Sequence, residues 1–143
     1  MGNDSVQEER AQGFTYDKTE NGWELLEDVE LEPDISSFED MELVFPFKGE
    51  EFCLSGEDFI QRARNEIGVN LGQRHAEYLL RHQKEIPKEW RGHCLVFPGT
   101  IWRVRVGHCE VPCLDWDNCY WCLNFIWMGG GFDFRYRLVH LRE

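Results

Sequence analysis

The sequence predicts an α+β fold in which an αα-hairpin is followed by a twisted antiparallel β-meander that can close into a small barrel. Two observations support this prediction. Between residues 55 and 86 apolar side chains recur at the spacing of amphipathic helices, and from residue 94 onward they alternate with a period of two. Helices that precede the strands of a domain are typical of the α+β class.

Charge is distributed unevenly along the 143 residues, a length with room for one domain. Residues 1–58 contain 18 Asp and Glu against three basic residues, whereas residues 59–143 contain nine against 12, so the net charge of −12 belongs to the first segment. Such asymmetry bears on binding partners rather than on fold. We expect residues 1–40 to form an acidic N-terminal extension and residues 41–143 to form the α+β domain, with a boundary between 41 and 55.

The acidic extension has two parts. Residues 1–22 are polar and lack apolar periodicity, which favours disorder. Residues 23–47 interleave hydrophobic with acidic residues, a composition typical of segments that fold when they bind. In the alternative, Met41–Phe47 is a strand of the domain and Lys48-Gly49 is its turn. Both alternatives remain open at this point.

Capping residues mark the two predicted helices. The first begins at Ser55, followed three positions later by an acidic residue, and ends at Gly68, which suits a left-handed C-terminal position. The second is capped by Asn70 and ends near Ile86, before a proline. The short link between them predicts the αα-hairpin.

Five strands are predicted after the helices, separated by turn-forming residues that contain glycine, proline, aspartate or asparagine. Ten of the 20 aromatic residues lie in residues 95–143, which places the centre of the core there. The predicted strands are Cys94–Phe97, Ile101–Val106, Val111–Trp116, Cys119–Trp127 and Phe132–Leu141.

Four closely spaced cysteines raise the question of a zinc site. They are Cys109, Cys113, Cys119 and Cys122. Zinc needs four ligands that converge tetrahedrally, but positions three apart on a strand point to opposite faces. We therefore expect the cysteines to be reduced and mostly buried, with no bound metal and no cofactor.

Two further patterns are candidates for catalysis. His93-Cys94 and His108-Cys109 place an imidazole beside a thiol in sequence, but a nucleophilic cysteine needs its base nearby in space. Asp115 and Asp117 flank a tryptophan, and Asp117 followed by asparagine is typical of a hairpin turn. We expect no catalytic residues and no enzymatic activity.

Arginines alternate with apolar residues in two predicted strands. If both strands turn their apolar faces the same way, four arginines line one face of the sheet, and a basic sheet face near aromatics can hold single-stranded nucleic acid. A solvated outer face and a docking face for the acidic extension are the alternatives. The four residues are Arg103, Arg105, Arg135 and Arg137.

The sequence contains no signal-like start and no run of 18 apolar residues. We therefore expect an intracellular, cytoplasmic protein that does not contact a membrane. Its oligomeric state is left open.

Three motifs resemble a group of hypothetical prokaryotic proteins that have no assigned activity. They are Asn70–Ala76, Ile86-Pro87-x-x-Trp90, and Leu95–Thr100 followed by x-Trp102-Arg103. The resemblance covers residues 55–143, so it implies a domain boundary but no function.

The leading functional prediction is a non-enzymatic interaction module. Its acidic and hydrophobic extension would dock on a basic surface, either of a protein partner or of its own sheet. The alternatives are a single-stranded nucleic-acid-binding domain that uses the four arginines and an acidic inhibitor that mimics nucleic acid. The expected anchors are Trp23, Leu26, Val29, Leu31, Phe38, Leu43 and Phe45.

Overall fold

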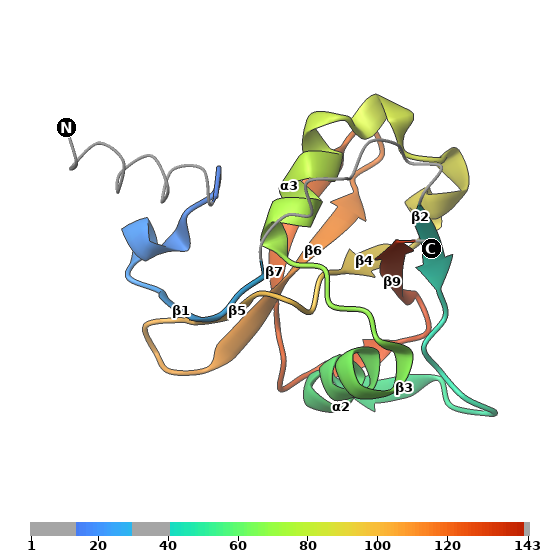
Figure 1. The fold of residues 1–143 in the computed structure, drawn as a ribbon, viewed down its shortest axis with the longest axis horizontal. Helices are drawn as coiled ribbons and strands as arrows, with labels where there is room; N and C mark the ends of the chain where they lie inside the picture. The colour runs from blue at the N-terminus through green and yellow to red at the C-terminus, as the bar shows by residue number, and fades with distance from the viewer. Residues whose placement is uncertain (1–13, 30–40, 142–143) are drawn as a thin grey trace.

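The computed structural model describes residues 14–29 and 41–141 and has the α+β fold that the sequence predicts (Figure 1). The described strands form a curled mixed sheet, a half-barrel, and a separate two-stranded ribbon of β3 and β8. The elements are η1 (Lys18–Asn21), β1 (Glu24–Glu27), β2 (Met41–Val44), β3 (Cys53–Ser55), α2 (Gly56–Arg62), η3 (Ala63–Ile67), α3 (Gln73–Arg81), η4 (Gln83–Glu85), η5 (Lys88–Gly92), β4 (Cys94–Val96), β5 (Ile101–Arg103), β6 (Cys109–Trp116), β7 (Trp121–Trp127), β8 (Gly131–Asp133) and β9 (Tyr136–Leu141).

Strand order in the large sheet is β1-β5-β6-β4-β9-β2, and β7 pairs with β6. The strands β4 and β5 follow one another along β6, and both run antiparallel to it. The strands β6 and β7 form the predicted hairpin, with Trp116 opposite Trp121 and Asn118 at a positive φ of 60° in the turn.

The prediction of a purely antiparallel sheet is wrong, because β4 and β9 run parallel. Parallel neighbours need a long connection, and here the chain passes through β5, β6, β7 and β8 before it returns beside β4. The N-terminal strands are also part of this sheet: β1 pairs with β5 and β2 pairs with β9.

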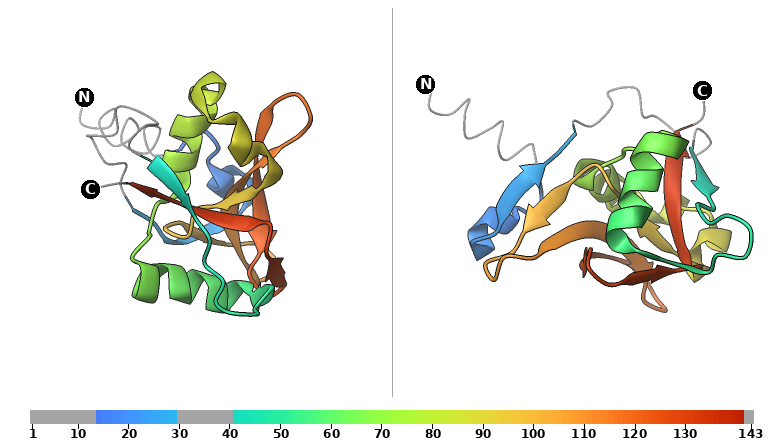
Figure 2. Two further views of the ribbon diagram at one scale, coloured as in Figure 1. Left: turned by 90° about the vertical axis from the view of Figure 1, so that its right-hand side faces the viewer. Right: turned by 90° about the horizontal axis from the view of Figure 1, so that it is seen from below.

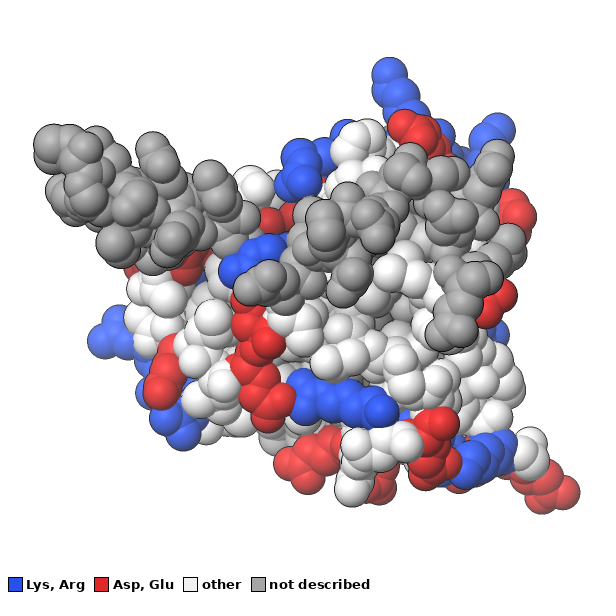
Figure 3. All heavy atoms as spheres, viewed as in Figure 1, with Lys and Arg blue, Asp and Glu red and all other residues white. Residues whose placement is uncertain are grey.

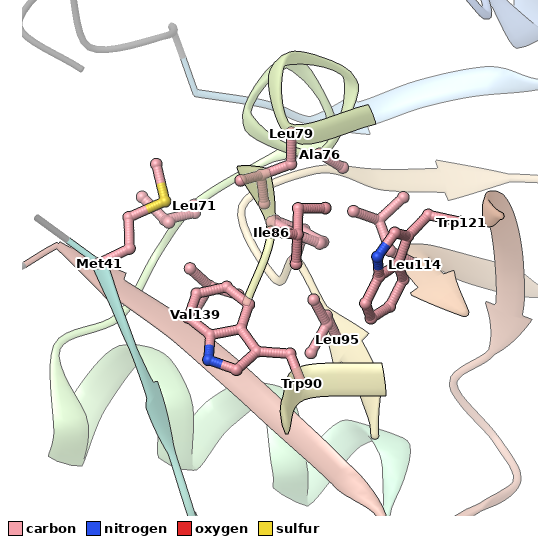
Figure 4. Packing of buried hydrophobic residues seen from close by; sticks show 11 residues of the cluster. Met41, Leu71, Ala76, Leu79, Ile86, Trp90, Leu95, Leu114, Trp121 and Val139 are labelled. Atoms are coloured by element: carbon pink, nitrogen blue, oxygen red, sulfur yellow. The ribbon is translucent and has the colours of Figure 1, made fainter. Parts of the chain in front are cut away.

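Both faces of the sheet are covered, and each has its own hydrophobic cluster. The strand β4 shows this division. Its consecutive residues Leu95 and Val96 are both fully buried, but they point to opposite faces and belong to different clusters. Figure 4 shows the first cluster, beneath α3, which includes Leu79, Leu114 and Trp121. The second cluster lies beneath α2 and the β3–β8 ribbon.

The two predicted helices exist, but they do not form an αα-hairpin. The first begins as expected, with the Ser55 hydroxyl accepting a hydrogen bond from the Asp58 N–H, and it ends through η3 at Gly68, whose φ is 83°. The link that follows passes from one face of the sheet to the other, since Val69 is buried in the second cluster and Leu71 in the first. As a result α2 and α3 lie on opposite sides of β4 and β9 (Figure 1, Figure 2).

The helix α3 begins at Gln73, not directly after Asn70. Its first N–H groups find partners outside the usual cap: Gly72 N–H donates to His75 Nδ1 at 3.0 Å, and Gln73 N–H donates to Thr100 Oγ1 at 2.8 Å. The start of α3 is therefore tied to the chain just before β5.

No helix in the described part of the chain has both the length and the apolarity to cross a bilayer.

We expect Phe59→Ala to lower the free energy of unfolding by about 3–5 kcal/mol, because Phe59 is 0% exposed in the second cluster. Phe52→Ala is the matched control, because Phe52 is 71% exposed, and it should change stability by less than about 0.5 kcal/mol. Urea unfolding measures both values. Equal losses in the two variants would contradict the assigned burial.

We also expect His75 to make the protein less stable in mild acid. Burial lowers the pKa of His75 from 6.5 to about 4. Smaller effects come from Asp28, which raises this pKa, and from Arg74, which lowers it. The unfolded chain therefore binds the proton more tightly, and the free energy of unfolding should fall by up to about 3 kcal/mol as the pH drops from 6.5 to 4. Urea unfolding across this range should show that the free energy of unfolding depends more steeply on pH in the wild type than in His75→Gln. Parallel pH curves for the two proteins would refute this role of His75.

Candidate functional site

Residues 14–29 of the predicted extension pack on the chain's own sheet. The ring of Phe14 lies 5.4 Å from that of Trp102, and Phe14 is buried. The ring of Trp23 lies 6.4 Å from Trp102 and 5.4 Å from Phe125, and β1 follows directly as an edge strand on β5. This part of the acidic segment is therefore a component of the fold and not a separate extension.

Buried polar side chains hold the start of this segment. Glu77, which is 3% exposed, accepts hydrogen bonds from the backbone N–H groups of Thr15 and Tyr16, both at 2.9 Å. The Gln73 amide donates to the Tyr16 carbonyl at 2.8 Å and accepts from Trp102 Nε1 at 2.7 Å. These bonds fix the segment against both α3 and β5.

The acidic side chains at the end of the segment pair with arginines of the body. The Asp28 carboxylate pairs with Arg74 and accepts a hydrogen bond from Thr100 Oγ1 at 2.7 Å. Arg64 and Arg74 were not predicted as partners, because their positions relative to the segment depend on the tertiary fold. The other pairs are Glu24–Arg103 and Glu27–Arg64, each at 2.5 Å.

The predicted anchors have different environments. Trp23 contacts the rings described above, and Val29 lies against the backbone of Gly72 and Gly99, where an added Cβ would come within 2.8 and 2.7 Å of its Cγ2. Leu26 is 39% exposed on β1. Leu43 packs against the first cluster, Phe45 is exposed, and Leu31 and Phe38 lie outside the described residues.

Three exposed phenylalanines lie near Arg137 or at the end of the β3–β8 ribbon, and we call this region the phenylalanine corner. They are Phe45, Phe52 and Phe134, which are 53%, 71% and 56% exposed. The register of β3 on β8 pairs Cys53 with Asp133, so Phe52 and Phe134 are the residues that directly flank this end of the ribbon. The Arg137 guanidinium lies 4.6 Å from the centre of the Phe45 ring and donates to the Phe134 carbonyl, so it joins the two sides of the patch.

The corner was predicted only in part. Phe45 and Arg137 were among the candidate residues, whereas Phe52 and Phe134 were not. The sequence offered one signal: Phe134 lies near the start of the last predicted strand, between Asp133 and Arg135, so a large apolar side chain has polar neighbours on both sides.

The four predicted arginines do not form one continuous face. The strands β5, which carries Arg103, and β9, which carries Arg137, are separated by β6 and β4. Arg103 pairs with Glu24, Arg105 follows β5 and packs over Gly22, and Arg135 pairs with Asp133 at 3.1 Å. Arg137 lies over an exposed aromatic ring, that of Phe45.

Acidic side chains surround the chain on both sides of Phe52. The Arg62 guanidinium holds the pKa of Glu51 at about 2 through a hydrogen bond. Within the described residues, Glu50, Glu57 and Asp58 are exposed and have no ion-pair partner at contact distance. The corner therefore combines apolar rings with an acidic border.

A hollow of about 330 Å³ lies beside β4 and the end of β6. Its lining includes His93, Cys94, Asp115 and Tyr136. The hydrogen bond to Cys113 and burial raise the pKa of the Cys94 thiol well above its usual range, and burial raises the pKa of Tyr136 to about 12. Both groups are therefore protonated at neutral pH, and Cys94 lacks the depressed pKa that an attacking thiolate needs.

All six cysteines are free. Among the four closely spaced cysteines, Cys113 is buried, whereas Cys119 is exposed in the β6–β7 turn. Cys113 instead lies beside Cys94 of β4, and Asp115 completes a cluster whose ligand atoms lie within 4.8 Å of one another. The sequence spacing of the quartet gave no indication of this grouping.

Comparison with protein-family models, with curated proteins and with solved structures finds no match to this chain.

We expect Asp28→Ala to lower the free energy of unfolding by about 1–3 kcal/mol, because Arg74 loses its ion pair and the Thr100 hydroxyl loses its acceptor in a mostly buried position. Glu24→Ala is the control: its pair with Arg103 is exposed, so its loss should stay below about 1 kcal/mol. Urea unfolding measures both. If the two variants lose the same stability, Asp28 is not the residue that fixes the segment.

Proposed function

We propose that this protein is a non-enzymatic interaction module that binds a protein partner through the phenylalanine corner. The observation that supports this proposal best is that three phenylalanines, each more than half exposed, flank Arg137 or the end of the β3–β8 ribbon. Single exposed hydrophobic residues are common on protein surfaces, but clusters of them mark interaction sites.

The energetics of the corner favour an interface. Burial of a phenylalanine side chain contributes about 1.5–3 kcal/mol relative to leaving it exposed. Aromatic and arginine side chains also carry much of the affinity in protein interfaces, and the corner supplies both through Phe45 and Arg137. A partner that covers the corner would gain this free energy.

The partner that fits the corner best is a protein with an apolar patch and a basic border. The unpaired acidic residues Glu50, Glu57 and Asp58 lie on either side of the strand that follows Phe52. The chain as a whole carries a net charge of −12, which speeds encounters with a basic surface. The composition predicts the same kind of basic partner, but here the binding surface is the folded phenylalanine corner and not a flexible extension.

Single-stranded nucleic acid is the second candidate, because Arg137 lies over Phe45, an exposed ring on which a base can stack. Three features weigh against it: Arg135 already pairs with Asp133, Arg137 is occupied by Phe45, and the surrounding charge is acidic. The inhibitor that mimics nucleic acid is supported less, because Glu24, Glu27 and Asp28 are paired with arginines. On the face in Figure 3, acidic and basic side chains are interspersed.

The thiol environments support a non-enzymatic role in a reducing compartment. The raised pKa of Cys94, and of Cys122 through burial, leaves these thiols protonated and weakly nucleophilic. Six free cysteines are typical of intracellular proteins.

A defined probe tests the proposal: an amphipathic peptide of alternating lysine and leucine, titrated into the protein at low salt. We expect the peptide to perturb the NMR signals of Phe45, Phe52 and Phe134. The double variant Phe52→Ala/Phe134→Ala should weaken its affinity at least tenfold, because two aromatic contacts are lost.

Val106→Ser is the matched control, because Val106 is 81% exposed but lies in the turn after β5, and it should leave peptide affinity unchanged. Binding of oligothymidine at the corner in place of the peptide would favour the nucleic-acid candidate. Absence of binding by either probe would contradict both.

A further inference from the structure

Three potential metal ligands meet on one face of the sheet. Cys94 lies on β4, and Cys113 and Asp115 lie at alternate positions of β6. The antiparallel register of β4 on β6 pairs Leu95 with Leu114, which sets Cys94 across from Asp115 with all three side chains on the same face. Their sulfur and oxygen atoms lie within 4.8 Å of one another.

We propose that Cys94, Cys113 and Asp115 bind a thiophilic divalent cation of the Zn²⁺ type, with the fourth coordination position open to the hollow beside β4. Two thiolates and a carboxylate are ligands that zinc accepts, and sites with three protein ligands leave one position for water or another donor. Tetrahedral zinc ligands are separated by about 3.5 Å, so small side-chain rotations bring these three into place.

The hollow gives the site access and a candidate for the fourth position. Cys94 and Asp115 line it, whereas Cys113 is fully buried behind them. His93 also lines the hollow, and its Nδ1 atom is buried without a hydrogen-bond partner. This imidazole can hold a water molecule that occupies the fourth position.

A neighbouring side chain already orients the carboxylate. Asn124 Nδ2 donates to Asp115 Oδ2 at 2.9 Å from the adjacent strand β7. Metal sites commonly have such outer hydrogen bonds, and their loss weakens metal binding by about 10–100-fold. Asn124 is therefore a positioning residue of the proposed site.

The charge balance of the surroundings also fits. Zn²⁺ with two thiolates and one carboxylate has a net charge of −1. Arg91 and Arg135 line the same hollow and can compensate this charge. A pair of thiols that served only as small hydrophobic residues would need neither the carboxylate nor the opening to solvent.

Cobalt is the probe that tests the site, because Co²⁺ replaces Zn²⁺ and shows thiolate charge-transfer and tetrahedral d–d absorption. Metal-free full-length protein, kept reduced, should bind one equivalent of Co²⁺ with both signatures, and Zn²⁺ should displace it. Cys94→Ser and Cys113→Ser should each weaken the charge-transfer band, and the double variant Cys94→Ser/Cys113→Ser should abolish it. Asp115→Asn should keep the band but bind more weakly, and Asn124→Ala should lose about 10–100-fold in affinity.

Cys119→Ser and Cys109→Ser are the matched controls, because these cysteines belong to the quartet that the sequence suggests but not to the cluster. Circular dichroism confirms folding, and if the serine variants are unfolded, the affinities of Asp115→Asn and Asn124→Ala decide the test. The proposal is overturned if wild-type protein shows no thiolate–cobalt band. It is equally overturned if the band keeps its full intensity in folded Cys94→Ser, or if Cys119→Ser or Cys109→Ser abolishes it.

Discussion

A buried hydrogen-bond network centred on Gln73 holds three distant parts of the chain together. Its side chain is 0% exposed and connects Tyr16 of the N-terminal segment, Glu77 of the same helix and Trp102 of β5. Its backbone N–H bonds Thr100, which in turn reaches the end of β1. In a medium of low dielectric such bonds are strong when all are made and costly when one is missing. The positions of the N-terminal segment, of α3 and of β5 therefore depend on one another.

This network explains why charge that is separated in sequence is not separated in space. Residues 14–29 are carried onto the sheet by buried contacts, and their carboxylates then meet Arg64, Arg74 and Arg103 of the body. A count of charges along the sequence assigns these carboxylates and arginines to different halves of the chain. The folded surface brings them within contact distance, so the net charge of a segment is a poor guide to its surface potential.

Local signals predicted local structure well, and non-local pairing remained beyond them. The Ser55 cap, the Gly68 terminus and the β6–β7 hairpin each depend on a few neighbouring residues, and all three were predicted correctly. The crossing of the chain between α2 and α3 and the parallel pairing of β4 depend on which faces are buried, which periodicity does not reveal. For the candidate site, Phe45 was predicted, but its neighbours come from segments whose proximity only the fold establishes.

The parallel pair at the centre of the sheet has a consequence for folding kinetics. Cys94 and Tyr136 are paired although they are 42 residues apart, whereas the β6–β7 hairpin closes over a four-residue turn. Because closing a long loop costs entropy before any contact is gained, β9 should join β4 late. Until it does, β4 is an uncovered, strongly apolar strand, and newly synthesised chains are most prone to aggregate during that interval.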